Sequence, residues 1–129
     1  MPITLVADTQ IFVWYLREPT RLSRAAVEAL EASTSTGSTI GVSASSIVEL
    51  VYASEKASNP FTPDDLDVLL GALDESDGPF EVVPVDADIA ARVRSVPRDS
   101  NADPGDRIVI ATAEVLGVAL VSADSKIQR

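Results

Sequence analysis

The 129-residue chain contains no cysteine and no histidine. Without cysteine it has no disulfide, no thiolate metal ligand and no thiol nucleophile, which is compatible with a reducing compartment. Without histidine it has no imidazole for acid–base catalysis or metal binding. A metal ion held by its side chains would therefore have oxygen ligands alone, which favours Mg²⁺ or Mn²⁺ over Zn²⁺.

Basic residues are also few, since ten Lys and Arg stand against twenty Asp and Glu, for a net charge of -10. A module that bound nucleic acid through phosphate contacts alone would be basic, so the balance argues against one. It does not exclude a nuclease, because carboxylates can hold metal and arginines can line one groove. Three arginines lie close together in sequence at Arg92, Arg94 and Arg98. The acidity also favours a basic partner protein.

Long apolar runs are absent. No segment approaches the roughly 18 consecutive apolar residues of a membrane span, and residues 1–4 do not begin a secretory signal. We therefore expect a cytoplasmic protein without membrane association. The length and an apolar content of 46% predict one domain over residues 1–129, with a core of its own.

Short apolar runs alternate with segments of helical periodicity along the chain. The first run, Ile3 to Ala7, is too short for a helix and predicts a buried strand. Residues 11–16 are ambiguous between strand and helix, and we favour a helix capped by Asp8 or Thr9, because parallel strands need a crossover element. The alternation predicts an α/β fold with a mainly parallel sheet covered by helices on both faces. The expected strands are residues 3–7, 39–42, 80–85 and 118–122, and the expected helices begin near residues 11, 22, 43, 62, 86 and 103.

Four carboxylates stand where an apolar run ends or a helix begins: Asp8, Glu49, Asp106 and Asp124. Each has an ordinary structural explanation. Asp8 fits a helix N-cap, and Ser46-x-x-Glu49 has the spacing of a capping box. Asp103-Pro104-Gly105-Asp106 is a good helix entry with Asp103 as the natural cap, and Asp124 fits an exposed loop.

The joint pattern of the four carboxylates points beyond capping. In a doubly wound sheet the carboxyl ends of the strands and the N-termini of the following helices share one edge, where ligands bind. Four anions brought together there would repel one another unless they were protonated or bound a metal ion. The sequence therefore predicts a site for a hard divalent cation.

These motifs, in this order, resemble the PIN-domain family, and within it the VapC-type ribonuclease toxins of toxin–antitoxin pairs. The carrying segments are residues 6–9, 42–50, 103–113 and 120–124. The resemblance implies a three-layer α/β/α PIN-like domain with a four- to five-stranded, mainly parallel sheet. It also implies a Mg²⁺- or Mn²⁺-dependent endoribonuclease that cleaves RNA phosphodiester bonds with a metal-activated water.

The resemblance also implies roles for individual residues. Asp8, Glu49, Asp106 and Asp124 would form the catalytic, metal-binding quartet, with Asp8 and Asp106 as direct ligands and Asp103 as an extra acid. Thr9 and Ser122 would orient ligands. Arg107 fits a phosphate contact and pairing with an acid equally well. The implied partners are an RNA substrate, a second copy of the chain, and an antitoxin whose basic C-terminal segment enters the acidic pocket.

Two other classes of protein fit part of the pattern. A haloacid-dehalogenase-like phosphatase has a second aspartate two residues after the first, where this chain has Gln10. Of the residues that a receiver domain needs, this chain has only the late lysine, at Lys126. A non-catalytic PIN-like binding module would keep the fold and the helix caps without binding metal. The absence of metal-dependent RNA cleavage by the purified chain would favour that module.

Overall fold

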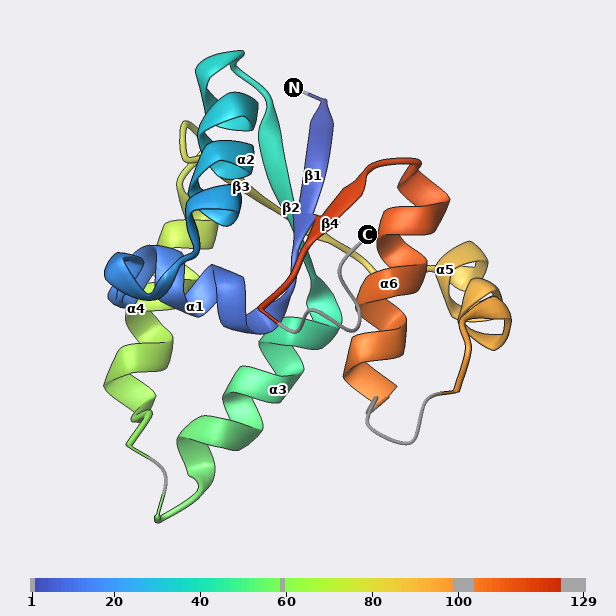
Figure 1. Ribbon diagram of the computed structural model, residues 1–129. Helices are drawn as coiled ribbons and strands as arrows, with labels where there is room; N and C mark the ends of the chain where they lie inside the picture. Colours follow the sequence, from blue (N-terminus) through green and yellow to red (C-terminus); the bar gives the residue numbers. More distant parts are fainter. Residues whose placement is uncertain (1, 59, 99–103, 124–129) are drawn as a thin grey trace.

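The computed structural model describes residues 2–58, 60–98 and 104–123 and has a parallel sheet at its centre (Figure 1). The described residues form four strands in the order β3-β2-β1-β4, and every neighbouring pair is parallel. The expectation of a mainly parallel sheet of four to five strands is thus confirmed. The strands are β1 (Ile3–Ala7), β2 (Thr39–Ser43), β3 (Phe80–Val83) and β4 (Ala119–Val121).

Each expected helix is present, and side-chain caps account for most of their starts. Ser23 caps the second helix, and Thr62 forms a reciprocal capping box with Asp65 at the start of the fourth. The helix expected over residues 86–96 is α-helical only in its first part and ends as the 3₁₀ turn Val93–Ser95. The helices are α1 (Thr9–Arg17), α2 (Arg24–Ser35), α3 (Ala44–Glu55), α4 (Pro63–Asp74), α5 (Ala87–Arg92) and α6 (Pro104–Leu116), with a 3₁₀ turn at Pro19–Arg21.

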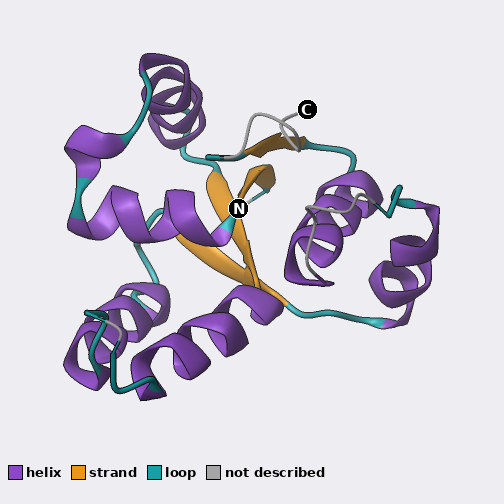
Figure 2. Cartoon of the chain, turned by 60° about the horizontal axis from the view of Figure 1, so that its bottom comes forward, coloured by secondary structure: helices purple, strands orange, loops and turns teal. Residues whose placement is uncertain are grey.

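Helices cover both faces of the sheet, as Figure 2 shows with the sheet seen between them. Leu5 and Ala7 of β1 point into the core beneath α1 to α4, whereas Val6 points into a second core beneath α5 and α6. This alternation follows from the two-residue period of a strand. Because both faces are covered, the strands carry continuous apolar runs, and the three-layer expectation is confirmed.

The order of the strands creates a switch point beside β1. From β1 the chain moves outward through β2 to β3, and it then returns to the other side of β1 to form β4. The crossovers on the two sides of β1 lie on opposite faces of the sheet. A crevice therefore opens between the carboxyl ends of β1 and β4, the place where open α/β sheets bind ligands.

In the described parts of the chain, no helix has both the length and the apolar character that crossing a membrane requires.

Candidate active site

A cavity of about 340 Å³ opens at the switch point. The first turn of α1 and the first two turns of α3 and α6 lie around it, at the lower edge of the sheet in Figure 1. The cavity is lined by Asp8, Thr9, Gln10, Glu49, Asp106, Val109 and Ala123. Three members of the expected acidic quartet thus share one cavity, although they lie far apart in sequence. Asp103 and Asp124, the other two expected acids, fall outside the described residues.

Asp8 is nearly buried, with 7% of its surface exposed, and is held by both carboxylate oxygens. Oδ1 accepts the backbone N–H of Ile11 at 2.8 Å, so Asp8 is the N-cap of α1. Oδ2 accepts the Ser122 hydroxyl at 2.7 Å and the Ala123 N–H at 3.1 Å. A carboxylate offers roughly four acceptor positions, so about one is left for a ligand. The capping and site explanations of Asp8 are therefore compatible.

Glu49 lies on the second turn of α3, facing the start of α1. Thr9 Oγ1 lies 3.1 Å from Glu49 Oε1 and 2.8 Å from Ser46 Oγ, and it can donate to either. The helix begins at Ala44 and is capped by Ser43, whose hydroxyl accepts the Ser45 N–H. The capping-box explanation of Glu49 is therefore wrong, because the helix begins before Ser46.

Asp106 is the third residue of α6 and is half-buried, and Val109 follows it by one turn on the same face. A carboxylate in the first turn of a helix is stabilised by the positive end of the helix dipole. Asp106 therefore stabilises the start of α6 and also lines the cavity.

The donor set of the cavity fits a hard cation. Its charged side chains are carboxylates, and Asp8 is already oriented by three hydrogen bonds from protein groups. Within residues 2–58, 60–98 and 104–123, however, no three acidic side chains approach closely enough to form a complete metal cage.

Arg107 points away from the acidic cavity. Its Nη2 donates to the backbone carbonyls of Val93 and Val96 at 2.9 and 3.0 Å, and its Nε is buried with no hydrogen-bond partner in the described structure. The side chain therefore ties the 3₁₀ turn after α5 to α6. These contacts favour a structural role over the phosphate contact and the acid pairing considered from the sequence.

Replacing Arg107 with methionine is expected to lower the free energy of unfolding by about 1–3 kcal/mol, because two partly buried carbonyls lose their donor. RNA cleavage by the folded protein should change little. Chemical denaturation beside a cleavage assay measures both effects. Arg94→Met is the matched control, since Arg94 is exposed on the 3₁₀ turn whose carbonyl Arg107 contacts. A strong loss of cleavage without loss of stability would instead favour a phosphate contact.

The sequence matches the PIN domain over residues 5–129. The chain belongs to the PIN-domain family. The segments that carried the resemblance, residues 6–9, 42–50, 103–113 and 120–124, all lie within this match.

Individual relatives agree with this PIN domain over nearly its whole length. Ribonuclease VapC22 of Mycobacterium tuberculosis is 28% identical over 125 residues, which cover 97% of this chain and 90% of that protein. A toxin–antitoxin complex from Klebsiella pneumoniae contains a chain of similar structure, with a TM-score of 0.64, 22% identity, and 95% and 88% of the two chains covered. The Mycobacterium tuberculosis VapC20 toxin, described as cleaving the sarcin–ricin loop, has a TM-score of 0.64 at 11% identity, with 96% and 92% covered.

Sequence reasoning missed three groups of this PIN domain that touch the site. Gln10 lines the cavity, Ser46 contacts Thr9, and the Ala123 N–H supports Asp8. One signal was available for Ser46, because residues three apart on a helix share a face and Glu49 follows at that spacing. The backbone N–H of Ala123 carries no sequence signal.

Proposed function

We propose that this PIN domain is a Mg²⁺- or Mn²⁺-dependent endoribonuclease and the toxin of a toxin–antitoxin pair. The observation that carries the proposal is the convergence of Asp8, Glu49 and Asp106 on one cavity at the switch point of the sheet. The similarity to a ribonuclease over nearly the whole chain supports the same activity. Family membership favours this function over the phosphatase and receiver alternatives.

Asp8 and Asp106 would hold the cation, and Glu49 and Asp124 would position water molecules around it. When bound, the cation would supply an activated water and neutralise charge on the cleaved phosphate. Asp8 is well prepared for this role, because Ile11, Ser122 and Ala123 fix its orientation before any ligand arrives. Glu49 lies against the Thr9 hydroxyl, which orients its carboxylate, and in this proposal it would accept a proton from the attacking water.

The proposal includes a basic antitoxin. One chain of similar structure comes from a toxin–antitoxin complex, and the net charge of -10 would attract a basic segment of a partner. The homodimer implied by the resemblance belongs to the same proposal. Light scattering of the purified chain, with and without the product of a neighbouring gene, tests both associations.

The activity is tested by incubating the purified chain with RNA in Mg²⁺, in Mn²⁺ or in EDTA. We expect cleavage in either metal and no cleavage in EDTA. Adding metal back to the EDTA sample should restore cleavage. Mn²⁺ should also raise the melting temperature, because an ion that binds only the folded chain stabilises it.

A non-catalytic PIN-like module gives the opposite pattern. It would show neither metal-dependent cleavage nor stabilisation by Mn²⁺. In a well-folded preparation, the absence of cleavage or the absence of stabilisation would contradict the nuclease proposal. Cleavage that persists at full rate in EDTA would point to a contaminating ribonuclease, which the inactive variants discussed below would reveal.

A further inference from the structure

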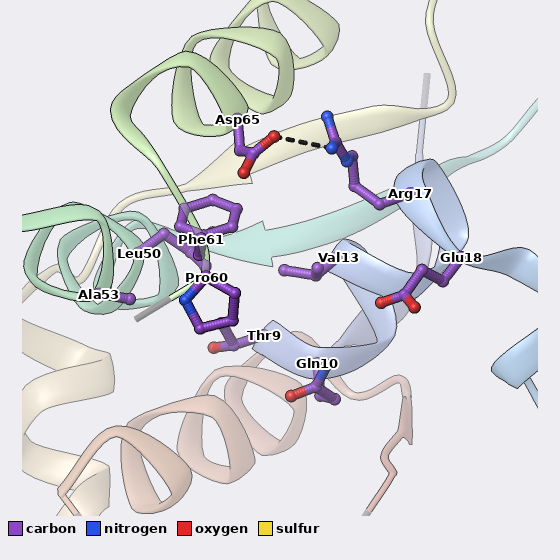
Figure 3. Close-up of a pocket in the computed structure, with 10 residues that line it drawn as sticks. All are labelled: Thr9, Gln10, Val13, Arg17, Glu18, Leu50, Ala53, Pro60, Phe61 and Asp65. Carbon is purple, nitrogen blue, oxygen red and sulfur yellow. Dashed lines mark ion pairs between the residues drawn. The ribbon is translucent and has the colours of Figure 1, made fainter. Parts of the chain in front are cut away.

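A second cavity, of about 470 Å³, lies between α1, α3 and the start of α4 (Figure 3). Its volume is within the roughly 300–1,000 Å³ of small-molecule sites. Figure 3 shows α1 side chains on one side and Leu50, Ala53, Pro60 and Phe61 facing them on the other. The cavity is thus a cleft between two walls.

The second cavity adjoins the acidic one at the start of α1. Thr9 and Gln10 line both cavities. Thr9, Val13 and Arg17 follow one another at intervals of four residues, so they form one stripe along α1, whose rise is about 12 Å at 1.5 Å per residue. Because Thr9 and Gln10 belong to both linings, a strand whose phosphate lay in the acidic cavity would have a neighbouring nucleoside beside the second one.

The walls of the second cavity suit a flat apolar group. Val13, Leu50 and Phe61 are half-buried or buried side chains in its lining. A nucleobase has an aromatic face on either side, and stacking on an aromatic side chain is a general mode of single-strand recognition. Gln10 is exposed at the junction of the two cavities and carries both a donor and an acceptor for a base edge.

The charges of this cavity disfavour a phosphate. Arg17 is paired with Asp65 at 2.7 Å, the contact drawn in Figure 3, and Glu18 adds a further negative charge to the rim. Asp65 is held in the ionised form, because the backbone N–H of Thr62 and the nearby Arg17 lower its pKa. Arg17 is thus paired with Asp65, and Glu18 lies 3.6 Å from Arg21, so these charges offer no net positive charge to a phosphate, while the carboxylates can accept hydrogen bonds from base N–H groups.

We propose that this cavity is the subsite for a nucleobase adjacent to the scissile phosphate, with Phe61 as its stacking residue and Gln10 at its edge. The inference rests on the proposed ribonuclease function and adds a determinant of specificity to it. The competing occupant is a segment of a partner protein, which apolar walls and an acidic rim would also accept. The sharing of Thr9 and Gln10 with the acidic cavity favours the base.

The test uses single-stranded RNA oligonucleotides with one mapped cleavage site, in which the base on either side of that site is removed to leave an abasic nucleotide. For the parent protein, loss of the base on one side should lower kcat/KM by on the order of 10-fold to 100-fold. Phe61→Ala and Gln10→Ala should cleave the intact oligonucleotide more slowly and show a much smaller penalty for base removal. Tyr52→Ala is the matched aromatic control, since Tyr52 is 66% exposed on α3 and outside the cavity.

Ala53→Trp provides a second test in case the Phe61 variant misfolds, because its larger side chain fills the cavity whereas Phe61→Ala enlarges it. We expect it to slow cleavage of the intact oligonucleotide and to leave cleavage of the abasic one nearly unchanged. An equal penalty for base removal in the parent and in all three cavity variants would overturn the inference, while cleavage by the parent would leave the proposed function standing. Variants that cleave normally but escape inhibition by the antitoxin would also overturn it and assign the cavity to the partner protein.

Discussion

Asp8→Asn is expected to reduce metal-dependent RNA cleavage by at least about 100-fold, because even the loss of a group that orients a metal ligand costs about 10–100-fold. Its amide can still cap α1 through Oδ1, but Nδ2 then faces the Ala123 N–H, which donates to Asp8 Oδ2 in the parent. The lost acceptor should lower the free energy of unfolding by about 1–3 kcal/mol. Initial rates with Mn²⁺ and denaturant unfolding measure the two effects separately.

Asp86→Asn is the matched control for this experiment. Asp86 caps α5 by accepting the Ile89 N–H at 2.9 Å, as Asp8 caps α1, but it lies outside the acidic cavity. Asparagine and aspartate cap helices about equally well, so this variant should keep both stability and cleavage. Cleavage by Asp8→Asn at the parental rate would contradict the ligand role, and an equal loss in Asp86→Asn would attribute the effect to general damage.

Phe12→Ala is expected to cause the largest loss of stability among the changes considered. Phe12 is fully buried and packs edge-to-face on Phe80, with ring centroids 5.0 Å apart and an interplanar angle of 84°. Removing a buried phenyl ring costs about 3–5 kcal/mol, a large share of the roughly 5–15 kcal/mol that stabilise a typical domain. Thermal and urea unfolding monitored by circular dichroism measure the change.

Two further variants serve as controls for Phe12→Ala. Tyr52→Ala removes an aromatic ring that is mostly exposed and should change stability by no more than about 0.5 kcal/mol. Phe12→Leu keeps most of the buried volume and should fall between the parent and Phe12→Ala. A Phe12→Ala protein as stable as Tyr52→Ala would mean that the core beneath α1 tolerates a cavity, in conflict with its close packing.

The layered fold was accessible from the sequence because each element carries a local signal. The helix over residues 11–16 shows the limit of such signals, since its density of apolar residues fits a strand equally well. Its position between two parallel strands and the Asp8 cap decided the question. The α5 helix shows the same limit at its end, where Arg107 binds the carbonyls of Val93 and Val96 and the chain closes as a 3₁₀ turn.

The candidate site was only partly accessible in this way. The residue types and spacings indicated which carboxylates to consider, and Asp8, Glu49 and Asp106 do line one cavity. The helix start expected near residue 43 is confirmed, since Ser43 caps α3, whereas the capping box considered at Ser46 was wrong. The site assignments of Asp103 and Asp124 stay predictions.

By itself the sequence determined the alternation of strands and helices, the all-oxygen chemistry of any metal site and the motifs of the PIN-domain family. These depend on residue type and on spacing within short segments. Only the tertiary structure decided that Ser122 and Ala123 support Asp8 across more than a hundred residues, that Arg107 faces away, and that a second cavity adjoins the first. Such contacts join segments distant in sequence, and the strand order that brings them together has no local signature.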